Sequence, residues 1–133
     1  MSPINVSLVM QAIADELVSA GVVENAYGWP VKQARPVCAI VGYPDALEFD
    51  ATFGRGSDKA TFPVYIVCGA VHDQSTRDVI SGYITGATGV KDALDGDLSG
   101  AVQTARVTDC TIDTLTLAGV EYLAARFLIE VYS

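Results

Sequence analysis

Positive charge is scarce in this sequence of 133 residues, which has eight lysines and arginines against sixteen aspartates and glutamates. The formal net charge is −8, and the basic residues form no cluster beyond the spacing of Lys32 and Arg35. Affinity for DNA and RNA comes mostly from neutralising phosphates. We therefore expect no tight binding to nucleic acid, although an acidic wall is suited to a place where DNA passes without adhering.

Histidine and cysteine are also rare. His72 is the single histidine, and the three cysteines, Cys38, Cys68 and Cys110, are far apart in the sequence. A zinc site needs several of these residues at characteristic spacing, and a disulfide framework usually has an even number of cysteines. Because all three cysteines lie in apolar, strand-like segments, we expect buried, reduced thiols. We expect no metal and no other cofactor.

Long hydrophobic runs are missing too. No run reaches the ~18 apolar residues typical of a membrane-spanning helix, and the N-terminus lacks the basic and apolar regions of a secretory signal. We expect a protein made and kept in a reducing cytoplasm, without membrane contact. Half of the residues are hydrophobic but only 18% are charged, against about 25% in a typical domain. This balance indicates that other subunits cover part of the apolar surface.

Hydrophobic periodicity predicts a first helix over residues 3–20. Ser2 is expected to cap it, Pro3 to occupy its first position and Gly21 to end it. Its apolar stripe recurs at helical spacing and consists of Val6, Val9, Met10, Ile13 and Leu17.

A second helix is predicted over residues 73–85, where Ser75 and Asp78 resemble a capping box. Its expected inner face consists of Val79, Ile80, Tyr83 and Ile84. Residues 90–94 are expected to add one further helical turn.

Apolar runs and alternation predict five strands, over residues 36–41, 46–53, 60–71, 101–112 and 122–131. In the last of these, one face is expected to hold Leu123, Ala125, Phe127, Ile129 and Val131, and the other Tyr122, Arg126 and Glu130. Residues 60–71 should be central, with a bulge or an edge near Pro63, which has no N–H to donate. Residues 22–30 are expected to be a connector, and residues 114–119 a hairpin loop. A single α+β domain over residues 1–133 follows, with a mostly antiparallel sheet, two main helices on one face and a projecting hairpin.

No group of residues predicts catalysis. His72 has no Gly-x-Ser-x-Gly serine to activate. The acidic loop with Asp92, Asp95 and Asp97 lacks the full spacing of a calcium loop. Asp58 and Lys59 are adjacent, so a strand would send them to opposite faces, unlike the acid and lysine of a metal-dependent nuclease. We expect a protein that is not an enzyme.

The tip of the projecting hairpin, residues 54–59, is too polar for the core. We expect its side chains Arg55, Ser57, Asp58 and Lys59 to contact a neighbouring subunit or partner. The acidic loop of residues 92–97 in the next subunit is a candidate partner for the two basic residues. The alternative is a solvated turn.

This order of elements resembles the tail terminator, or tail completion, proteins of long-tailed bacteriophages. The resemblance covers nearly the whole chain and rests on the segments 8–17, 49–68, 77–84 and 126–131. It implies a homo-oligomeric ring, usually of six subunits, that caps the tail tube, stops its growth and joins the tail to the head connector. It also implies a place in the virion, at the head-proximal end of the tail, after assembly in the host cytoplasm.

The resemblance brings no catalytic residues and no cofactor. Its implied partners are the tail tube protein and the head–tail connector protein, with DNA passing through the lumen. Three other hypotheses stay open: another neck or head–tail joining protein, a binding module for a small ligand or protein, and a small enzyme.

Overall fold

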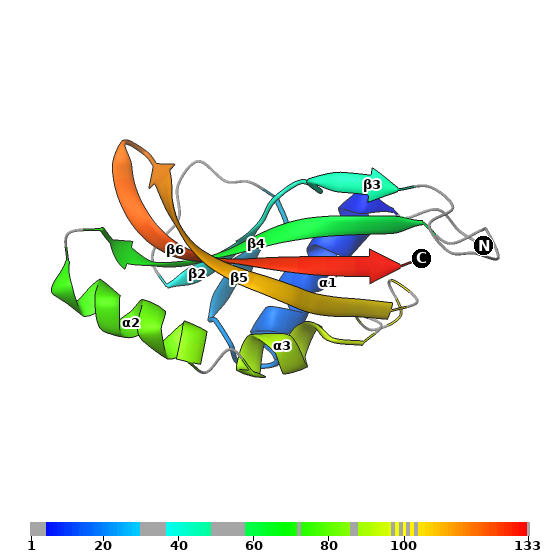
Figure 1. The fold of residues 1–133 in the computed structure, drawn as a ribbon, viewed down its shortest axis with the longest axis horizontal. Helices are drawn as coiled ribbons and strands as arrows, with labels where there is room; N and C mark the ends of the chain where they lie inside the picture. Colours follow the sequence, from blue (N-terminus) through cyan, green and yellow to red (C-terminus); the bar gives the residue numbers. More distant parts are fainter. Residues whose placement is uncertain are drawn as a thin grey trace.

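The structure is a computed structural model that describes residues 5–29, 37–48, 58–71, 73–85, 88–96, 98, 100, 102 and 104–132. Within these ranges the chain forms three helices and six strands (Figure 1). In chain order they are α1 (Val6–Ser19), β1 (Asn25–Tyr27), β2 (Cys38–Val41), β3 (Ala46–Glu48), β4 (Lys59–Ala70), α2 (Gln74–Thr85), α3 (Thr88–Leu94), β5 (Thr104–Leu117) and β6 (Val120–Tyr132).

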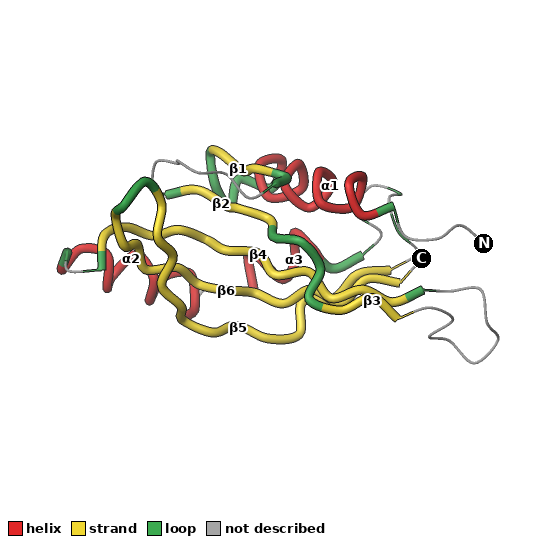
Figure 2. The backbone as a smooth tube through the Cα atoms, turned by 90° about the horizontal axis from the view of Figure 1, so that it is seen from above, coloured by secondary structure: helices red, strands yellow, loops and turns green. Residues whose placement is uncertain are grey.

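The described strands form one mostly antiparallel sheet in the order β1-β2-β4-β6-β5, with β3 also paired to β4 (Figure 2). The central place of β4 is confirmed. The prediction for residues 22–30 is wrong in part, because Asn25–Tyr27 pairs in parallel with β2. Three residues without alternation give no strand signal, so the pairing with β2 decides their conformation.

One face of the sheet carries all three described helices, as an α+β fold with helices on one face requires. Phe62 of β4 and Phe127 of β6 are fully buried beneath them. The helices add eight side chains to this core cluster, namely Val9, Met10, Ile13, Ala14, Leu17, Ile80, Val90 and Leu94. None of the described helices combines the length and hydrophobicity that crossing a bilayer needs.

The second face of the sheet is covered differently. A small apolar cluster lies there, made of Cys38, Ile40, Val67 and Leu117, with Tyr27, Tyr65, Leu115 and Tyr122 packed around it. No side chain of the described helices belongs to this cluster. Instead, the far end of the β5–β6 hairpin contributes Leu115 and Leu117, and this end curves away from the rest of the sheet in Figure 1. We call this second side the open face.

The strand pattern of β6 is confirmed. The core side of β6 holds Leu123, Ala125, Phe127, Ile129 and Val131. Side chains on the other side are half-buried and include Tyr122, Arg126 and Glu130. Alternation identified both faces because only one of them meets the helices.

The cap of α1 differs from the prediction. Asn5 is the N-cap, and its side-chain oxygen accepts a hydrogen bond from the Leu8 N–H at 3.1 Å; Ser2 and Pro3 lie outside the described residues. At the other end Gly21 has φ +75°. The Gly21 N–H donates to Val18 at 3.0 Å and the Val22 N–H to Leu17 at 3.0 Å. These two hydrogen bonds around a glycine in the left-handed conformation confirm that Gly21 terminates the helix.

The start of α2 also differs from the prediction. Asp73 is the capping residue, because its carboxylate accepts from the Ser75 N–H at 3.0 Å and from the Ser75 hydroxyl at 2.8 Å. Ser75 is therefore a donor to the cap, and its pairing with Asp78 in a capping box is wrong. The two hydrogen bonds favour the charged carboxylate and lower the pKa of Asp73.

Pro63 lies beside a break in the sheet. Its carbonyl accepts from the Gly42 N–H at 2.9 Å, and the Thr61 carbonyl accepts from the Asp45 N–H at 2.8 Å. Between these two bonds the neighbouring chain leaves the ladder, because β2 ends at Val41 and β3 begins at Ala46. The missing donor of Pro63 thus faces the interruption, which confirms the predicted irregularity.

The turn between β5 and β6 is shorter than expected. The strands extend to Leu117 and from Val120, so the turn contains only Ala118 and Gly119. Their φ angles are 52° and 80°, as a two-residue hairpin turn of type I′ requires. The predicted hairpin loop of residues 114–119 is therefore wrong in part, because Thr114 and Thr116 pair with β6. β5 also begins at Thr104, three residues later than predicted.

The three cysteines differ in exposure. All are free thiols; Cys38 and Cys68 are buried, whereas Cys110 is exposed, so the expectation of three buried thiols is wrong. Cys110 is on the helix side of β5, opposite Phe127, but no described helix covers that part of β5. Burial raises the pKa of Cys38 and of Cys68 to about 11, and desolvation raises the pKa of Cys110 as well, so accessibility is what sets Cys110 apart.

This difference predicts selective labelling of Cys110. At pH 8, a thiol with a pKa near 11 is ionised in about one molecule in a thousand, and only the thiolate reacts. Iodoacetamide should therefore modify Cys110 first in the folded protein and all three thiols in denaturant. Peptide mass mapping after a time course gives the order, and labelling of Cys38 at the rate of Cys110 would contradict the structure.

Candidate subunit interface

The predicted contact residues are only partly described. Arg55 and Ser57 lie outside the described residues. Asp58 is 9% exposed and precedes β4. The Lys59 ammonium lies 3.6 Å from the Glu130 carboxylate of β6, and each side chain is 27% exposed. At least one of the predicted contact residues, Lys59, thus already has an ion-pair partner within its own chain.

The acidic loop has a structural contact as well. Asp95 accepts a hydrogen bond from the Val107 N–H at 2.9 Å and so fixes the chain before β5 to the start of that strand. Asp92 is exposed on α3, and Asp97 lies outside the described residues, as does His72. Across the described ranges, no group of three or more His, Cys, Asp or Glu side chains is arranged to hold a metal ion.

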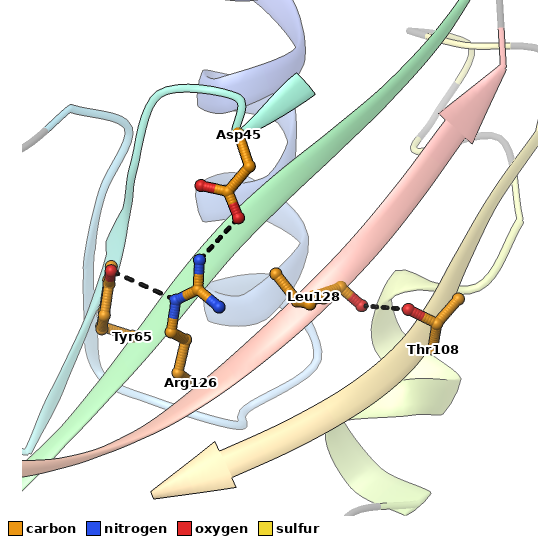
Figure 3. A network of polar contacts seen from close by, with 5 residues as sticks. All are labelled: Asp45, Tyr65, Thr108, Arg126 and Leu128. Carbon is orange, nitrogen blue, oxygen red and sulfur yellow. Dashed lines mark hydrogen bonds and ion pairs between the residues drawn. The ribbon is translucent and has the colours of Figure 1, made fainter. Parts of the chain in front are cut away.

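A polar network lies at the centre of the open face (Figure 3). Arg126 donates from Nη2 to Asp45 at 2.6 Å and from Nε to the Tyr65 hydroxyl at 3.3 Å. Its guanidinium also lies 5.8 Å from the centre of the Tyr65 ring. The hydrogen bond to Tyr65 and the pairing with Asp45 raise the pKa of Arg126. The network ties residues 42–45 to the β4–β6 pair.

Ion pairs between basic and acidic side chains reduce the net charge at the centre of the open face, whereas the whole chain has a net charge of −8. Two cations of this face, Lys59 and Arg126, each have a carboxylate partner, and a third, Arg106, lies opposite Glu130 in the β5–β6 pair.

Elsewhere on the surface two large aromatic side chains are exposed, Tyr43 at 66% and Trp29 at 54%. Trp29 also contacts the Tyr27 ring edge-on, with centroids 5.9 Å apart. Tyrosine, tryptophan and arginine are the residues most enriched where binding energy concentrates in protein interfaces.

A hollow lies between the end of α1 and the helices α2 and α3. Its volume is about 450 Å³, and its lining includes Gly21, Val22, Asp78, Gly82 and Tyr83. The Tyr83 hydroxyl donates to the Val22 carbonyl at 2.9 Å and closes one side. The described lining offers apolar surface and one carboxylate but no nucleophile with a base beside it.

Sequence reasoning identified Lys59 but missed the network of Asp45, Tyr65 and Arg126. These residues come from three separated segments, and their distance in the chain removes any local signal. Of this network, the sequence predicts only that Arg126 lies on the side of β6 away from the core, because apolar and polar residues alternate along the strand.

Comparison with known proteins adds little to these observations. No family model matches the sequence, and no curated protein matches it. One of the similar solved structures aligns with 95% of this chain and 94% of its own, at 18% identity and a TM-score of 0.49. A likeness at that level carries no argument about function, so the assignment depends on the residues themselves.

Proposed function

We propose that this chain is a structural virion protein that forms a ring, of about six subunits as the resemblance implies, on the end of a phage tail tube. The ring ends tail elongation and joins the tail to the head connector. The observation that carries the proposal is the centre of the open face, where Lys59 and Arg126 are paired with carboxylates. The apolar cluster with Tyr27, Tyr65 and Tyr122 lies on the same face and includes no side chain of a described helix, so this surface is suited to a second copy. The order of elements on which the resemblance rests also agrees with the proposal.

The electrostatics favour this face over the rest of the surface as a subunit contact. Two chains of charge −8 repel each other where their acidic surfaces meet. Around Arg126 and Lys59 the carboxylates are already neutralised within the chain, so contact there avoids the repulsion. A ring requires this face to meet a different surface of the next subunit, because closed rings use heterologous contacts.

In this proposal Arg55, Ser57, Asp58 and Lys59 add a second contact, to the next subunit or to the tail tube. The remaining acidic surface lines a lumen that repels phosphate, so DNA passes without adhering. The role is structural and not catalytic. The protein acts at the head-proximal end of the tail, after assembly in the host cytoplasm.

Ring formation is tested with Tyr43→Glu, which places a new charge on the exposed segment between β2 and β3, two residues before Asp45 of the polar network. Light scattering after size exclusion, and electron microscopy with and without the tail tube protein, should show rings for the parent and none for the variant. Leu8→Glu is the matched control, because Leu8 is 52% exposed on α1. It should assemble like the parent. Equal assembly by both variants would contradict a subunit contact on the open face.

The hairpin contact needs a different design, because Lys59→Glu alone breaks the ion pair with Glu130. The double variant Lys59→Glu/Glu130→Lys keeps an opposite-charge pair within the chain while exchanging the two positions. Comparison with Arg55→Glu distinguishes an effect on folding from the loss of a contact with the neighbouring subunit. Loss of assembly in both, with unchanged melting, supports the tip as a contact; normal assembly in both makes it a solvated turn.

A small-molecule binding module is the second candidate, and the hollow beside Tyr83 favours it. Val79→Phe would fill that space with an aromatic ring. The measurement is whether a ligand that is recovered with the purified parent protein is lost from the variant. Its loss, with normal ring formation, would support the binding module and leave the ring proposal unaffected.

A further inference from the structure

No described strand pairs with the outer edge of β5 for most of its length. At its start the edge is occupied: Ala105 exchanges both backbone hydrogen bonds with Gly96, and the Val107 N–H donates to Asp95. After the bulge between Val107 and Asp109, β6 is the only described strand that pairs with β5. Apart from the Thr114 N–H, which donates to Asp113, the backbone of the segment from Asp109 to Leu117 has no hydrogen-bond partner among the described residues outside β6. This side of the strand therefore offers backbone donors and acceptors to a further strand.

The side chains beside this edge are exposed on both faces of the strand. Ile112, on the helix side, is 58% exposed, and Cys110 next to it is also exposed. The other face has Asp109 and Asp113, which form no ion pair with any described residue. Within the described part of the chain, the Asp113 carboxylate accepts one hydrogen bond, from the N–H of Thr114 at 2.9 Å.

We propose that the open edge of β5 binds an extended basic segment of another protein, which adds to the sheet as an antiparallel strand. Backbone hydrogen bonds supply affinity in this mode, and alternate side chains supply specificity. Opposed residues share a face in an antiparallel pair. The segment therefore has lysine or arginine opposite Asp109 and Asp113, with apolar residues opposite Cys110 and Ile112. Its core reads basic, apolar, any residue, apolar, basic.

The charges exclude a second copy of this chain from the same edge. Self-pairing about Thr111 would set Asp109 against Asp113 of the other copy twice, and like charges directly opposite destabilise a strand pair. The edge strand at the far side of the sheet, β1, has only three residues and follows the exposed Glu24. Acidic side chains thus protect the edge from copies of itself while selecting a basic partner.

This inference goes beyond the ring proposal and does not depend on it. It concerns a different protein as occupant, and it applies to the monomer as well as to an assembled ring.

The test uses a fluorescent peptide, Thr-Lys-Val-Thr-Val-Lys-Thr, and the full chain, with binding followed by anisotropy. We expect saturable binding and slower amide exchange at residues 110–116. Asp109→Asn/Asp113→Asn should weaken binding about tenfold, at roughly two- to fivefold for each cross-strand charge pair. The matched control Asp15→Asn/Asp92→Asn removes the same charge from exposed helix positions and should bind like the parent.

Backbone pairing is separated from simple charge attraction by N-methylation. Methylation of the peptide amides that face β5 removes their hydrogen bonds and should weaken binding by about tenfold or more. Methylation of the alternate amides, which face solvent, should change it little. Equal loss in both peptides, or equal binding to both aspartate variants, means charge attraction alone and overturns the proposal. If the unmodified peptide does not bind, the aspartates of β5 only prevent pairing with other copies, and this result also overturns the proposal.

Discussion

Phe127→Asp is expected to give no soluble folded protein. Phe127 is fully buried at the middle of β6, on the face of the sheet that the helices cover. Truncation of a buried phenylalanine to alanine already costs about 3–5 kcal/mol. An unpaired carboxylate in that place adds a desolvation penalty of several kcal/mol more, which together reaches the total stability of about 5–15 kcal/mol that domains have.

The control for Phe127→Asp comes from the neighbouring strand. Ile112→Asp introduces the same carboxylate on the same side of the sheet, at a residue that is 58% exposed, and it should remain soluble with nearly unchanged melting. The soluble fraction after expression and the circular dichroism melting curve measure both. If Phe127→Asp melts like the parent, the assignment of this residue to the core is wrong.

Gly69→Val should lower the free energy of unfolding by about 2–5 kcal/mol, through backbone strain and overpacking. Gly69 follows the bulge in β4 and has φ +153°, a conformation that side chains with a Cβ rarely adopt. A Cβ there would also collide with the hydroxyl of Thr76, a residue only 2% exposed in the first turn of α2. The substitution therefore strains the strand and pushes α2 away from the sheet.

Two further variants distinguish the sources of that loss. Gly69→Ala/Thr76→Ala removes the hydroxyl that the added methyl would meet, and should recover part of the stability while the backbone strain remains. Gly82→Ala lies in α2 with no atom within 4 Å of the added carbon. It should stabilise the protein by up to about 1 kcal/mol. Urea denaturation gives all three values, and a Gly69→Val loss below that of the double variant would contradict the packing of α2 on Gly69.

Periodicity predicted those elements whose two faces meet different surroundings. The core side of β6 and the stripe of α1 are clear because water lies on one side and the helix–sheet interface on the other. Pro63 was informative for a similar reason, since the missing N–H restricts where it can lie in a sheet. These are local consequences of side-chain chemistry, and a single sequence contains them.

The features that were missed depend on positions set by other parts of the chain. Cys110 and Phe127 face the same side of the sheet, yet one is exposed and the other buried, because helices cover only part of that side. Asn25–Tyr27 becomes a strand through its pairing with β2. The ion pair between Asp45 and Arg126 joins distant segments, so no spacing in the sequence indicates it.

The strand order has a consequence for synthesis. β6 lies between β4 and β5 in the middle of the sheet, yet it is made after every other described element. Until it emerges, β4 has no neighbour on that edge, and Phe62, Val64 and Ile66 have only part of their final cover. Exposed edges and apolar surface in such intermediates are where aggregation begins. The tight turn at Ala118 and Gly119 keeps β5 and β6 adjacent in the chain, and because a local hairpin closes in about 1–10 µs, its formation adds almost nothing to the time that synthesis takes.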